Sequence, residues 1–367
     1  MPGKVVLVLL LGVFAFAPSA GAQECSAPNV IDQPFPTTGP EETRWQFCWT
    51  VEVGHGLIIT SAQFRTTPAG PWIPVIKDAR IAEIFVPYHD GEPRYLDVSL
   101  GFPAVPLDAA RDCPTSIGGQ VLAGGAVCRE VRDRGLAWKN DRRVRRGEAV
   151  TLWSVLDAGN YNYVIEWTFQ DDGVILSRVG ATGENLPSAP LVAHMHGPIW
   201  RLDLDIGGPN DDAVFVGEHA ESNFRGIDTV RRVDVETGVE WNAERFTALH
   251  IHDMTLKNEN GKASGYHLMP QRWGTPRHRE DFSRYDFWVT VANPLELLGD
   301  LLPTYVSRPE PLDGKDIVVW YYGGVHHLVR DEDGRPVDGK WDGDAHIMWT
   351  GFTLKPHNLF SRTPLRP

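Results

Sequence analysis

Residues 162–169 read NYVIEWTF, residues 171–173 read DDG, and residues 174–179 read VILSRV. Two runs rich in β-branched and aromatic residues, separated by turn residues, are typical of neighbouring β-strands. Helical periodicity is rare, and residues 294–302 are the best short candidate. The sequence therefore predicts an all-β fold, arranged as one large β-sandwich rather than as two domains. Further strand-like runs lie at residues 56–64, 80–87, 149–155 and 316–322, and the turn NENG at 258–261.

The charge of the chain limits the partners that it can have. The sequence carries 35 Lys and Arg against 48 Asp and Glu, a formal net charge of −13 in 367 residues. Such an acidic chain repels phosphates, so neither nucleic acid nor an anionic membrane surface is expected as a partner. A cationic small molecule is mildly favoured.

The first residues have the pattern of a cleaved export signal. A positive residue precedes an apolar run at 5–17, and Ala20-Gly21-Ala22 offers a small-residue cleavage site. The run is too short to span a bilayer, and no later segment is long and apolar enough to do so. We therefore expect a signal peptide at 1–22, an extended lead-in at 23–42 and one domain at 43–367, in a protein that is secreted or periplasmic.

The cysteines agree with export. The sequence has four of them, Cys25, Cys48, Cys113 and Cys128. An even number in an exported protein suggests two disulfides. Of the three possible connectivities, we expect the pairs that are closest in sequence, Cys25–Cys48 and Cys113–Cys128.

Two His-x-His pairs are candidate metal ligands. His194-Met195-His196 lies in an apolar stretch, and residues two apart on a strand share a face, so both imidazoles can reach one metal ion. His250-Ile251-His252 has the same spacing, so spacing alone does not separate the two pairs. Two histidines are only half a site, and unrelated polar residues on a half-exposed strand are the alternative interpretation.

A third ligand has to come from another segment. His326-His327 follows the predicted buried strand at 316–322, and only one of two adjacent strand residues can face a shared site. Tyr161 also stands out, because Gly159 and Asn160 interrupt an otherwise regular strand just before it. A tyrosine at such a break is usually a packing residue. Composition and periodicity decide neither which of His326 and His327 is a ligand nor whether Tyr161 has a chemical role.

Several short motifs, in one order from about residue 40 to the C-terminus, resemble the catalytic domain of the copper/topaquinone amine oxidases. The resemblance implies a large antiparallel β-sandwich of the supersandwich type, and it favours the Cys113–Cys128 disulfide. The motifs are Val86-Pro87-Tyr88, Tyr95-Leu96-Asp97, Arg134 to Lys139 after Cys128, Asn160-Tyr161-Asn162-Tyr163 with Glu166-Trp167, Asp172-Gly173, Val179 to Gly183, His194-Met195-His196 with Arg201 to Asp205, Trp288-Val289-Thr290, Asp316 to Trp320 with His327, and Gly351 to Pro356.

The resemblance assigns metals to particular residues. It implies copper on His194, His196 and His327, because the motifs around these histidines match and those around the other pair do not. It also implies a second, peripheral site, in which hard oxygen ligands suit calcium. The candidate calcium ligands are Asp203, Asp205 and Asp316, and exposed acids at strand ends are the alternative.

The resemblance also assigns catalytic roles. It implies that Tyr161, in the motif that Asn160 begins, is converted by copper and dioxygen to topaquinone. Asp97 would be the catalytic base, Tyr88 would hydrogen-bond the quinone, and Tyr95 would shape the substrate entrance. The implied reaction oxidises a small primary amine to an aldehyde, reduces dioxygen to hydrogen peroxide and releases ammonia. Family members are dimers, so a homodimer is expected by analogy.

The chain departs from the family pattern beside the implied cofactor. Asn162 stands where an acid is usual, Asp157 where threonine is usual, and Val98-Ser99 follows Asp97 where Gly-Glu is usual. These departures sustain a second hypothesis, a non-oxidase copper-binding protein of the same fold in which Tyr161 stays unmodified.

Overall fold

The strands predicted at 162–169 and 174–179 form a hairpin. The computed structural model describes residues 28–222, 225–273, 277–338 and 340–365. In it, β9 (Tyr161–Gln170) pairs antiparallel with β10 (Ile175–Gly183). Gly173 in the connecting turn has a φ of 87°, a left-handed conformation that glycine adopts at little cost. Because side chains alternate, β9 turns its tyrosines and its tryptophan toward the core.

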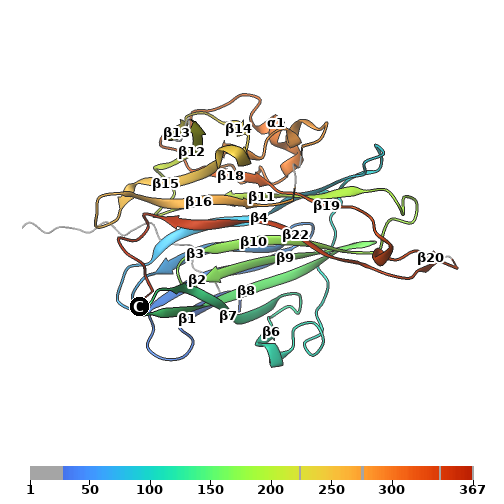
Figure 1. Cartoon of the computed structure of the whole chain (residues 1–367), viewed down its shortest axis with the longest axis horizontal. Helices are drawn as coiled ribbons and strands as arrows, with labels where there is room; N and C mark the ends of the chain where they lie inside the picture. The colour runs from blue at the N-terminus through green and yellow to red at the C-terminus, as the bar shows by residue number, and fades with distance from the viewer. Residues whose placement is uncertain (1–27, 223–224, 274–276, 339, 366–367) are drawn as a thin grey trace, which may run out of the picture.

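One ten-stranded sheet holds the first strands of the chain and several later ones (Figure 1). Its order is β1-β2-β3-β4-β11-β18-β17-β14, with β5 paired to β4 and β19 paired to β11. The strands are β1 (Val30–Phe35), β2 (Thr43–Glu52), β3 (Gly56–Arg65), β4 (Ile73–Pro87), β5 (Arg94–Leu96), β11 (His194–Asp203), β14 (Thr237–Val239), β17 (Phe287–Val291), β18 (Ile317–Tyr322) and β19 (Val325–His327).

A second ten-stranded sheet has the order β13-β12-β15-β16-β22-β10-β9-β8-β7-β6. Besides β9 and β10 it contains β6 (Gly119–Val121), β7 (Cys128–Lys139), β8 (Val144–Ala158), β12 (Asp212–Ser222), β13 (Arg225–Val233), β15 (Ala248–Lys257), β16 (Ala263–Gln271) and β22 (Ala345–His357). The short hairpin of β20 (Pro336–Val337) and β21 (Lys340–Trp341) lies at the right-hand end of Figure 1.

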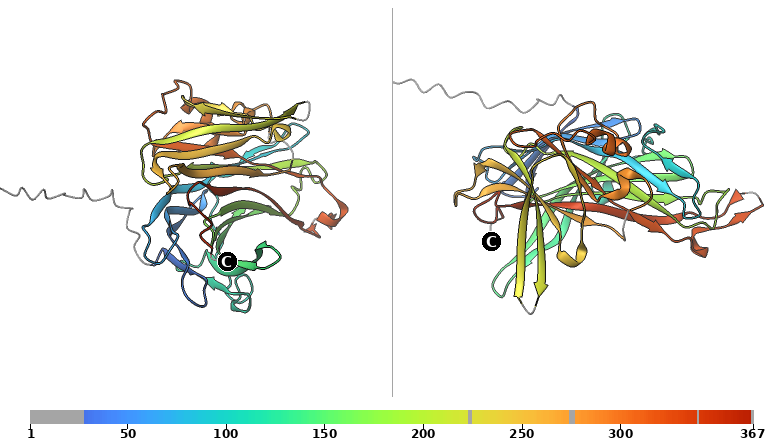
Figure 2. Two further views of the ribbon diagram at one scale, coloured as in Figure 1. Left: turned by 60° about the vertical axis from the view of Figure 1, so that its left-hand side comes forward. Right: turned by 90° about the horizontal axis from the view of Figure 1, so that it is seen from above.

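Aromatic side chains join the two sheets, which lie face to face in the turned views (Figure 2). Phe47 of the first sheet stacks on Phe169 of the second with ring centroids 4.1 Å apart. Trp200 of β11 meets Phe352 of β22 edge-on at 5.4 Å. Truncating a buried aromatic of this kind costs about 3–5 kcal/mol, so such pairs fix the sheets against each other. The pairings are antiparallel throughout, so the predicted all-β sandwich is confirmed.

Helices in the described residues are short. The prediction of a helix at 294–302 was wrong, because the helix α1 is Leu302–Tyr305, preceded by the 3₁₀ turn η4 (Gly299–Leu301). The side chain of Asn293 accepts a hydrogen bond from the backbone N–H of Leu295 at 3.0 Å, which favours a turn at the expected helix start. No helix in the described ranges is long and apolar enough to span a membrane. The other 3₁₀ turns are η1 (Thr115–Ile117), η2 (Ala243–Arg245), η3 (Asp281–Arg284) and η5 (Asp331–Asp333).

One predicted disulfide is present. Cys113 and Cys128 are bonded, with Cα atoms 5.8 Å apart, which confirms that pairing. The signal peptide and Cys25 lie outside the described residues, so the leader and the Cys25–Cys48 bond stay predictions. The predicted lead-in at 23–42 carries β1, which pairs with β2 and so belongs to the first sheet.

Candidate metal centre and active site

The three histidines assigned to copper come together at one end of β11. Every residue of β11 is buried, and the alternation of side chains puts His194 and His196 on one face. β19 runs beside this end of β11 with His327 directly opposite His194. One ring nitrogen from each of the three lies within 4.8 Å of the others. Strand pairing therefore supplies the third ligand position that local spacing left open.

Tyr161 reaches this cluster from the other sheet. Its hydroxyl lies 2.7 Å from Nδ1 of His327 and 3.4 Å from Oδ1 of Asn185. Its ring centroid is 4.5 Å from that of His196. Burial raises the pKa of Tyr161 well above its usual value, so the phenol is neutral in the absence of a cation. The hydroxyl thus adjoins the space that a shared metal ion would occupy.

Hydrogen bonds on the far side of each imidazole fix which nitrogen faces that space. Nδ1 of His194 donates to the carbonyl of Val192 at 3.0 Å, which leaves Nε2 with the lone pair. Tyr163 donates its hydroxyl hydrogen to Asp97 at 2.8 Å, so its oxygen can accept from Nδ1 of His196 at 3.1 Å. Nε2 of His196 is buried and has no hydrogen-bond partner in the described part of the chain.

The third ring is held in the same manner. Nε2 of His327 contacts Oδ2 of Asp333 at 3.0 Å, so Nδ1 carries the lone pair, 3.3 Å from Nε2 of His194. Burial acts to raise the pKa of Asp333, but hydrogen bonds from Arg330 and His327 outweigh it and hold that pKa below its usual value. Carboxylate and carbonyl partners of this kind orient metal-binding histidines. All three lone pairs therefore point into one space.

Metal binding requires neutral imidazoles, and burial favours the neutral form of two of the three. Burial lowers the pKa of His194 to about 4 and that of His196 well below its usual value, and the neighbouring imidazoles lower both further. Three imidazoles with convergent ring nitrogens, one of which is buried without a hydrogen-bond partner among the described residues, fit a copper ion.

A cavity of about 210 Å³ opens next to Tyr161. Its walls are mostly apolar, with one carboxylate, that of Asp97. Burial raises the pKa of Asp97 to about 7, against the hydrogen bond from Tyr163, which acts to lower it. The cavity is lined by Val86, Tyr88, Tyr95, Asp97, Leu100, Phe102, Ala158, Gly159, Asn160, Tyr161, Tyr163 and His196.

The remaining predicted residues surround this cavity. The ring of Tyr88 stacks on His194 with centroids 4.4 Å apart, and Tyr95 meets Tyr88 edge-on at 6.4 Å. The side-chain amide of Asn160 donates to the carbonyl of Glu184 at 2.9 Å, which ties down the turn that carries Tyr161.

A family model described as copper amine oxidase, enzyme domain, matches residues 41–366. The chain belongs to the copper amine oxidase family. It is 24% identical over 409 residues to the copper-containing amine oxidase alpha 2, peroxisomal, of Arabidopsis thaliana, covering 88% of this chain and 58% of that protein. It is 28% identical over 399 residues to histamine oxidase of Arthrobacter globiformis, covering 86% and 55%. The chain thus spans just over half the length of these relatives.

Solved structures agree on the fold. The copper-containing benzylamine oxidase of Hansenula polymorpha superposes with a TM-score of 0.74 at 20% identity, covering 95% of this chain and 65% of that chain. The Aspergillus nidulans amine oxidase gives a TM-score of 0.70 at 19% identity, covering 94% and 57%. The resemblance inferred from the motifs is therefore confirmed at the level of family and fold.

Two of the departures from the amine oxidase pattern lie away from the cavity. Asn162 points to the opposite face of β9 from Tyr161 and Tyr163, since strand side chains alternate. Asp157 accepts a hydrogen bond from the backbone N–H of Gly159 at 3.0 Å, in the exposed turn between β8 and β9. Neither side chain lines the cavity.

The third departure, after Asp97, lies in a segment that is held by a residue that the sequence did not single out. Glu83 of β4 is fully buried and accepts hydrogen bonds from the backbone N–H of Val98 at 2.7 Å and from the hydroxyl of Ser99 at 2.6 Å. It also accepts from the backbone N–H of Ile84 at 2.9 Å. Glu83 thereby fixes the segment that presents Asp97. Burial raises the pKa of Glu83 to about 7, against these hydrogen bonds.

The competing histidines lie elsewhere. His326 is exposed and approaches His89, with ring centroids 4.7 Å apart, as the alternation along β19 requires. His250 and His252 lie on β15 in a different cluster. The choice of His327 and of the first His-x-His pair therefore agrees with the geometry.

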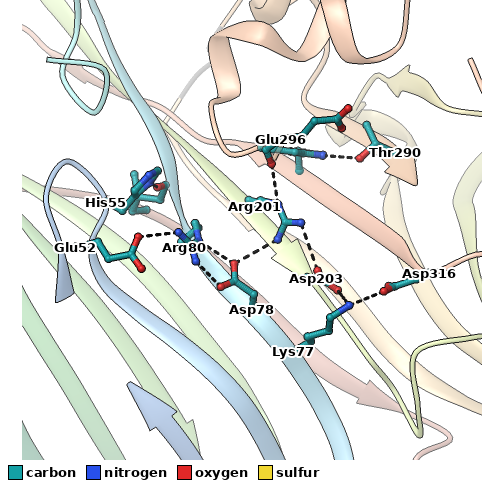
Figure 3. A network of polar contacts seen from close by, with 12 residues as sticks. Glu52, His55, Lys77, Asp78, Arg80, Arg201, Asp203, Thr290, Glu296 and Asp316 are labelled. Atoms are coloured by element: carbon teal, nitrogen blue, oxygen red, sulfur yellow. Dashed lines mark hydrogen bonds and ion pairs between the residues drawn. The ribbon is translucent and has the colours of Figure 1, made fainter. Parts of the chain in front are cut away.

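The predicted calcium ligands meet at the other end of β11, where Figure 3 shows Asp203 and Asp316 on either side of Lys77. Asp203, Asp205 and Asp316 each offer a carboxylate oxygen within 4.8 Å of the others. Nζ of Lys77 lies 2.5 Å from Asp316 and 3.7 Å from Asp203, and Arg201 binds Asp203 at 3.3 Å. One oxygen of each of the three aspartates is buried without a hydrogen-bond partner among the described residues. This end of the strand therefore carries buried negative charge that Lys77 offsets only in part.

Replacing Asp333 tests how the metal centre is oriented. Asp333→Ala removes the partner of His327 Nε2, so the ring loses its fixed tautomer and orientation. We expect copper affinity to fall about 10–100-fold, measured by titration against a competing chelator. Asp331→Ala, at an exposed position two residues earlier, is the matched control and should bind as the wild type does. Equal affinities for all three proteins would contradict the role of Asp333.

Proposed function

We propose that this protein is a primary-amine oxidase that uses copper and topaquinone formed from Tyr161. The observation that carries the proposal is the position of the Tyr161 hydroxyl, 2.7 Å from His327 among three convergent histidines and at the wall of a cavity that also contains Asp97. Membership of the copper amine oxidase family supports oxidation of amines in general. The products, an aldehyde, hydrogen peroxide and ammonia, are part of the proposal.

His194, His196 and His327 would hold the copper ion with Nε2, Nε2 and Nδ1. When bound, copper would supply redox chemistry toward dioxygen, and the quinone would supply an electron-accepting carbonyl. Burial favours the neutral form of His194 and His196, and backbone, tyrosine and carboxylate partners fix the orientation of all three rings.

Asp97 would act as the base that removes a proton from the substrate carbon. A pKa near 7 suits this role, because the carboxylate is available at neutral pH and still basic enough to accept a proton. Tyr163 holds Oδ2 of Asp97 and leaves Oδ1 for the substrate. The apolar walls from Val86, Leu100 and Phe102 would exclude water around an amine with a small apolar substituent.

Tyr88 and Tyr95 would shape the approach to the cofactor. Tyr88 is buried against His194 and would contact the modified ring of Tyr161, while Tyr95 is only half buried and meets Tyr88 edge-on. The substrate would be a small primary amine, and dioxygen would be the second substrate. Homodimer formation remains a prediction from the family.

We also propose that calcium binds Asp203, Asp205 and Asp316. Burial, together with the charge of Asp316, raises the pKa of Asp205 to about 7, which reflects the cost of bringing these carboxylates together. Oxygen donors and several formal negative charges suit a hard cation. Calcium would take over the neutralisation that Lys77 provides in part.

An extracytoplasmic location is proposed from the predicted leader together with the Cys113–Cys128 disulfide. Disulfides of this kind form in oxidising compartments. The name of the Arabidopsis relative places that protein in the peroxisome.

Intact-peptide mass decides whether the cofactor forms. After copper loading in air, the tryptic peptide that contains Tyr161 should gain about 30 Da, because the change from tyrosine to topaquinone adds two oxygen atoms and removes two hydrogen atoms. Tyr161→Phe should show no gain, and neither should His194→Ala, which lacks a copper ligand. An unshifted wild-type peptide in a protein with bound copper would favour the non-oxidase copper-binding protein instead.

The pH dependence of turnover tests the base. The unprotonated form of Asp97 is the active one, so kcat/KM should rise with pH through about 7 and level off above it. Asp97→Asn should lower kcat/KM at least about 100-fold with the cofactor still formed. Asp90→Asn, at an exposed nearby turn, should keep both the rate and the profile. A profile in Asp97→Asn that still rises through pH 7 would show that another group is the base.

Calcium should raise thermal stability if the acidic cluster binds it. At a calcium concentration about 100 times Kd, the expected stabilisation is roughly 2.7 kcal/mol, seen as a higher melting temperature than in chelator. Asp205→Asn should lose most of this effect, whereas Asp211→Asn, an exposed neighbour, should keep it. The site assignment fails if calcium changes the melting temperature of all three proteins equally and magnesium has the same effect as calcium.

A further inference from the structure

A second histidine cluster lies on the outer face of the second sheet, away from the candidate active site. It consists of His250 and His252 of β15, His267 of β16 and His357 of β22. All four side chains are half-buried, and one ring nitrogen from each lies within 4.8 Å of the others. Their neighbours Leu249, Ile251, Tyr266 and Leu268 are buried in the core, so the four imidazoles point outward.

The register of three strands builds this four-histidine cluster. His250 lies opposite His267, and Gly265 lies between His252 on one side and His357 on the other. A Cβ atom at Gly265 would come 2.3 Å from Cδ2 of His252, closer than such atoms can approach. Because Gly265 has no side chain, the outer imidazoles meet across the middle strand, with His252 Nε2 and His357 Nδ1 2.9 Å apart.

The rings are crowded and remain neutral. The ring centroids of His250 and His267 are 3.7 Å apart, and those of His267 and His357 are 4.0 Å apart. Burial is the main cause that lowers the pKa of His250 and of His252 to about 4 and that of His267 to about 3. Repulsion from the neighbouring histidines, if these were protonated, lowers the pKa values further. At neutral pH every ring therefore keeps a lone pair for a ligand.

One nitrogen in the cluster lacks a partner. Nε2 of His267 is buried and accepts or donates no hydrogen bond within the described residues. A buried polar atom without a partner costs free energy, and a cation at the centre of the cluster would remove that cost. The exposed Lys355, opposite His267 on β22, is the nearby positive charge and can extend into solvent.

We propose that His250, His252, His267 and His357 bind a divalent transition-metal ion of the class that prefers imidazole, such as Zn²⁺. Zinc in a tetrahedral site has N–Zn distances of about 2.0–2.1 Å, so its ligand nitrogens stand roughly 3.3 Å apart. The observed spacing, from 2.9 Å to within 4.8 Å, needs only small ring rotations to reach that geometry. Imidazole donors alone do not suit calcium or magnesium, which take oxygen ligands.

Four protein ligands give this site a structural role. A tetrahedral ion that is fully coordinated by protein has no open position for a substrate. The bound ion would join β15, β16 and β22 on their outer face. The site is remote from Tyr161, because Gly183, which pairs with Tyr161, also pairs with Ala345 at the opposite end of β22 from His357. That separation is 12 residues along β22, or about 40 Å at 3.3 Å per residue.

Metal analysis of the copper-loaded protein tests the proposal. After incubation with Zn²⁺ and removal of free metal, the wild type should retain one additional zinc per chain, measured by elemental mass spectrometry. His267→Ala should weaken zinc binding about 100-fold or more, because one of the four ligands is lost. His219→Ala, on the neighbouring strand β12 and paired with Asp228 instead, is the matched control and should retain the zinc.

Two further measurements separate this site from the copper centre and from misfolding. His194→Ala, which lacks a copper ligand, should still take up zinc at the four-histidine cluster. His357→Gln should melt as the wild type does in chelator but lose the rise in melting temperature that zinc gives the wild type. Wild-type protein that retains no additional zinc, or His267→Ala and His357→Gln that retain it undiminished, would overturn the proposal.

Discussion

The pairing of β11 with its neighbours is the constraint on which the metal centre depends. β11 is hydrogen-bonded to β4 on one side and to β18 and β19 on the other, and it is buried along its whole length. Since strand side chains alternate, a slip by one residue would present Met195 and Gly197 in place of His194 and His196. The same slip would displace His327 from its position opposite His194. A change of register would cost a large free energy in a strand that is paired on both edges and buried on both faces. The fold therefore fixes which histidines can act as ligands.

A polar network inside an apolar core then sets the chemistry. Burial lowers the pKa of His194 and of His196 and raises that of Asp97, and both effects have the same cause, the loss of solvating water. Tyr163 joins the two by donating to Asp97 and accepting from His196. The proton position at Asp97 and the orientation of one metal ligand are thus linked through a single hydroxyl. A low local dielectric strengthens such linked contacts and makes the loss of any one of them costly.

Local signals accounted for the strands and for part of the site. The alternating runs, the turn at Asp171-Asp172-Gly173 and the His-x-His pair are short-range patterns, and each was found where the sequence predicted it. The choice of His327 over His326 rested on family motifs before the pairing with β11 explained it. In the sequence Tyr163 stands out only as part of a motif, although a residue two positions after Tyr161 on a strand has to share its face.

Residues contributed by distant segments could not be found from local patterns. Glu83 precedes the segment that it holds by 15 residues and carries no spacing signal, and Asp333 acts through a turn after β19. The four-histidine cluster required the pairing of three strands. Local spacing therefore presents His250-Ile251-His252 only as a competitor for the copper site, because its partners His267 and His357 lie on other strands.

The two histidine clusters differ in burial and in the number of ligands, and these two properties distinguish catalytic from structural metal sites. The centre at β11 has three histidines, lies in the interior and faces a cavity of about 210 Å³, so a bound metal keeps room for Tyr161 and for small molecules. The cluster on β15, β16 and β22 has four histidines on a half-exposed surface and adjoins none of the cavity-lining residues. Catalytic metal sites keep an open position, and structural ones close it with protein ligands. The same residue type and the same two-residue spacing would therefore serve different proposed functions, because one pair faces the inside of the sandwich and the other its outer surface.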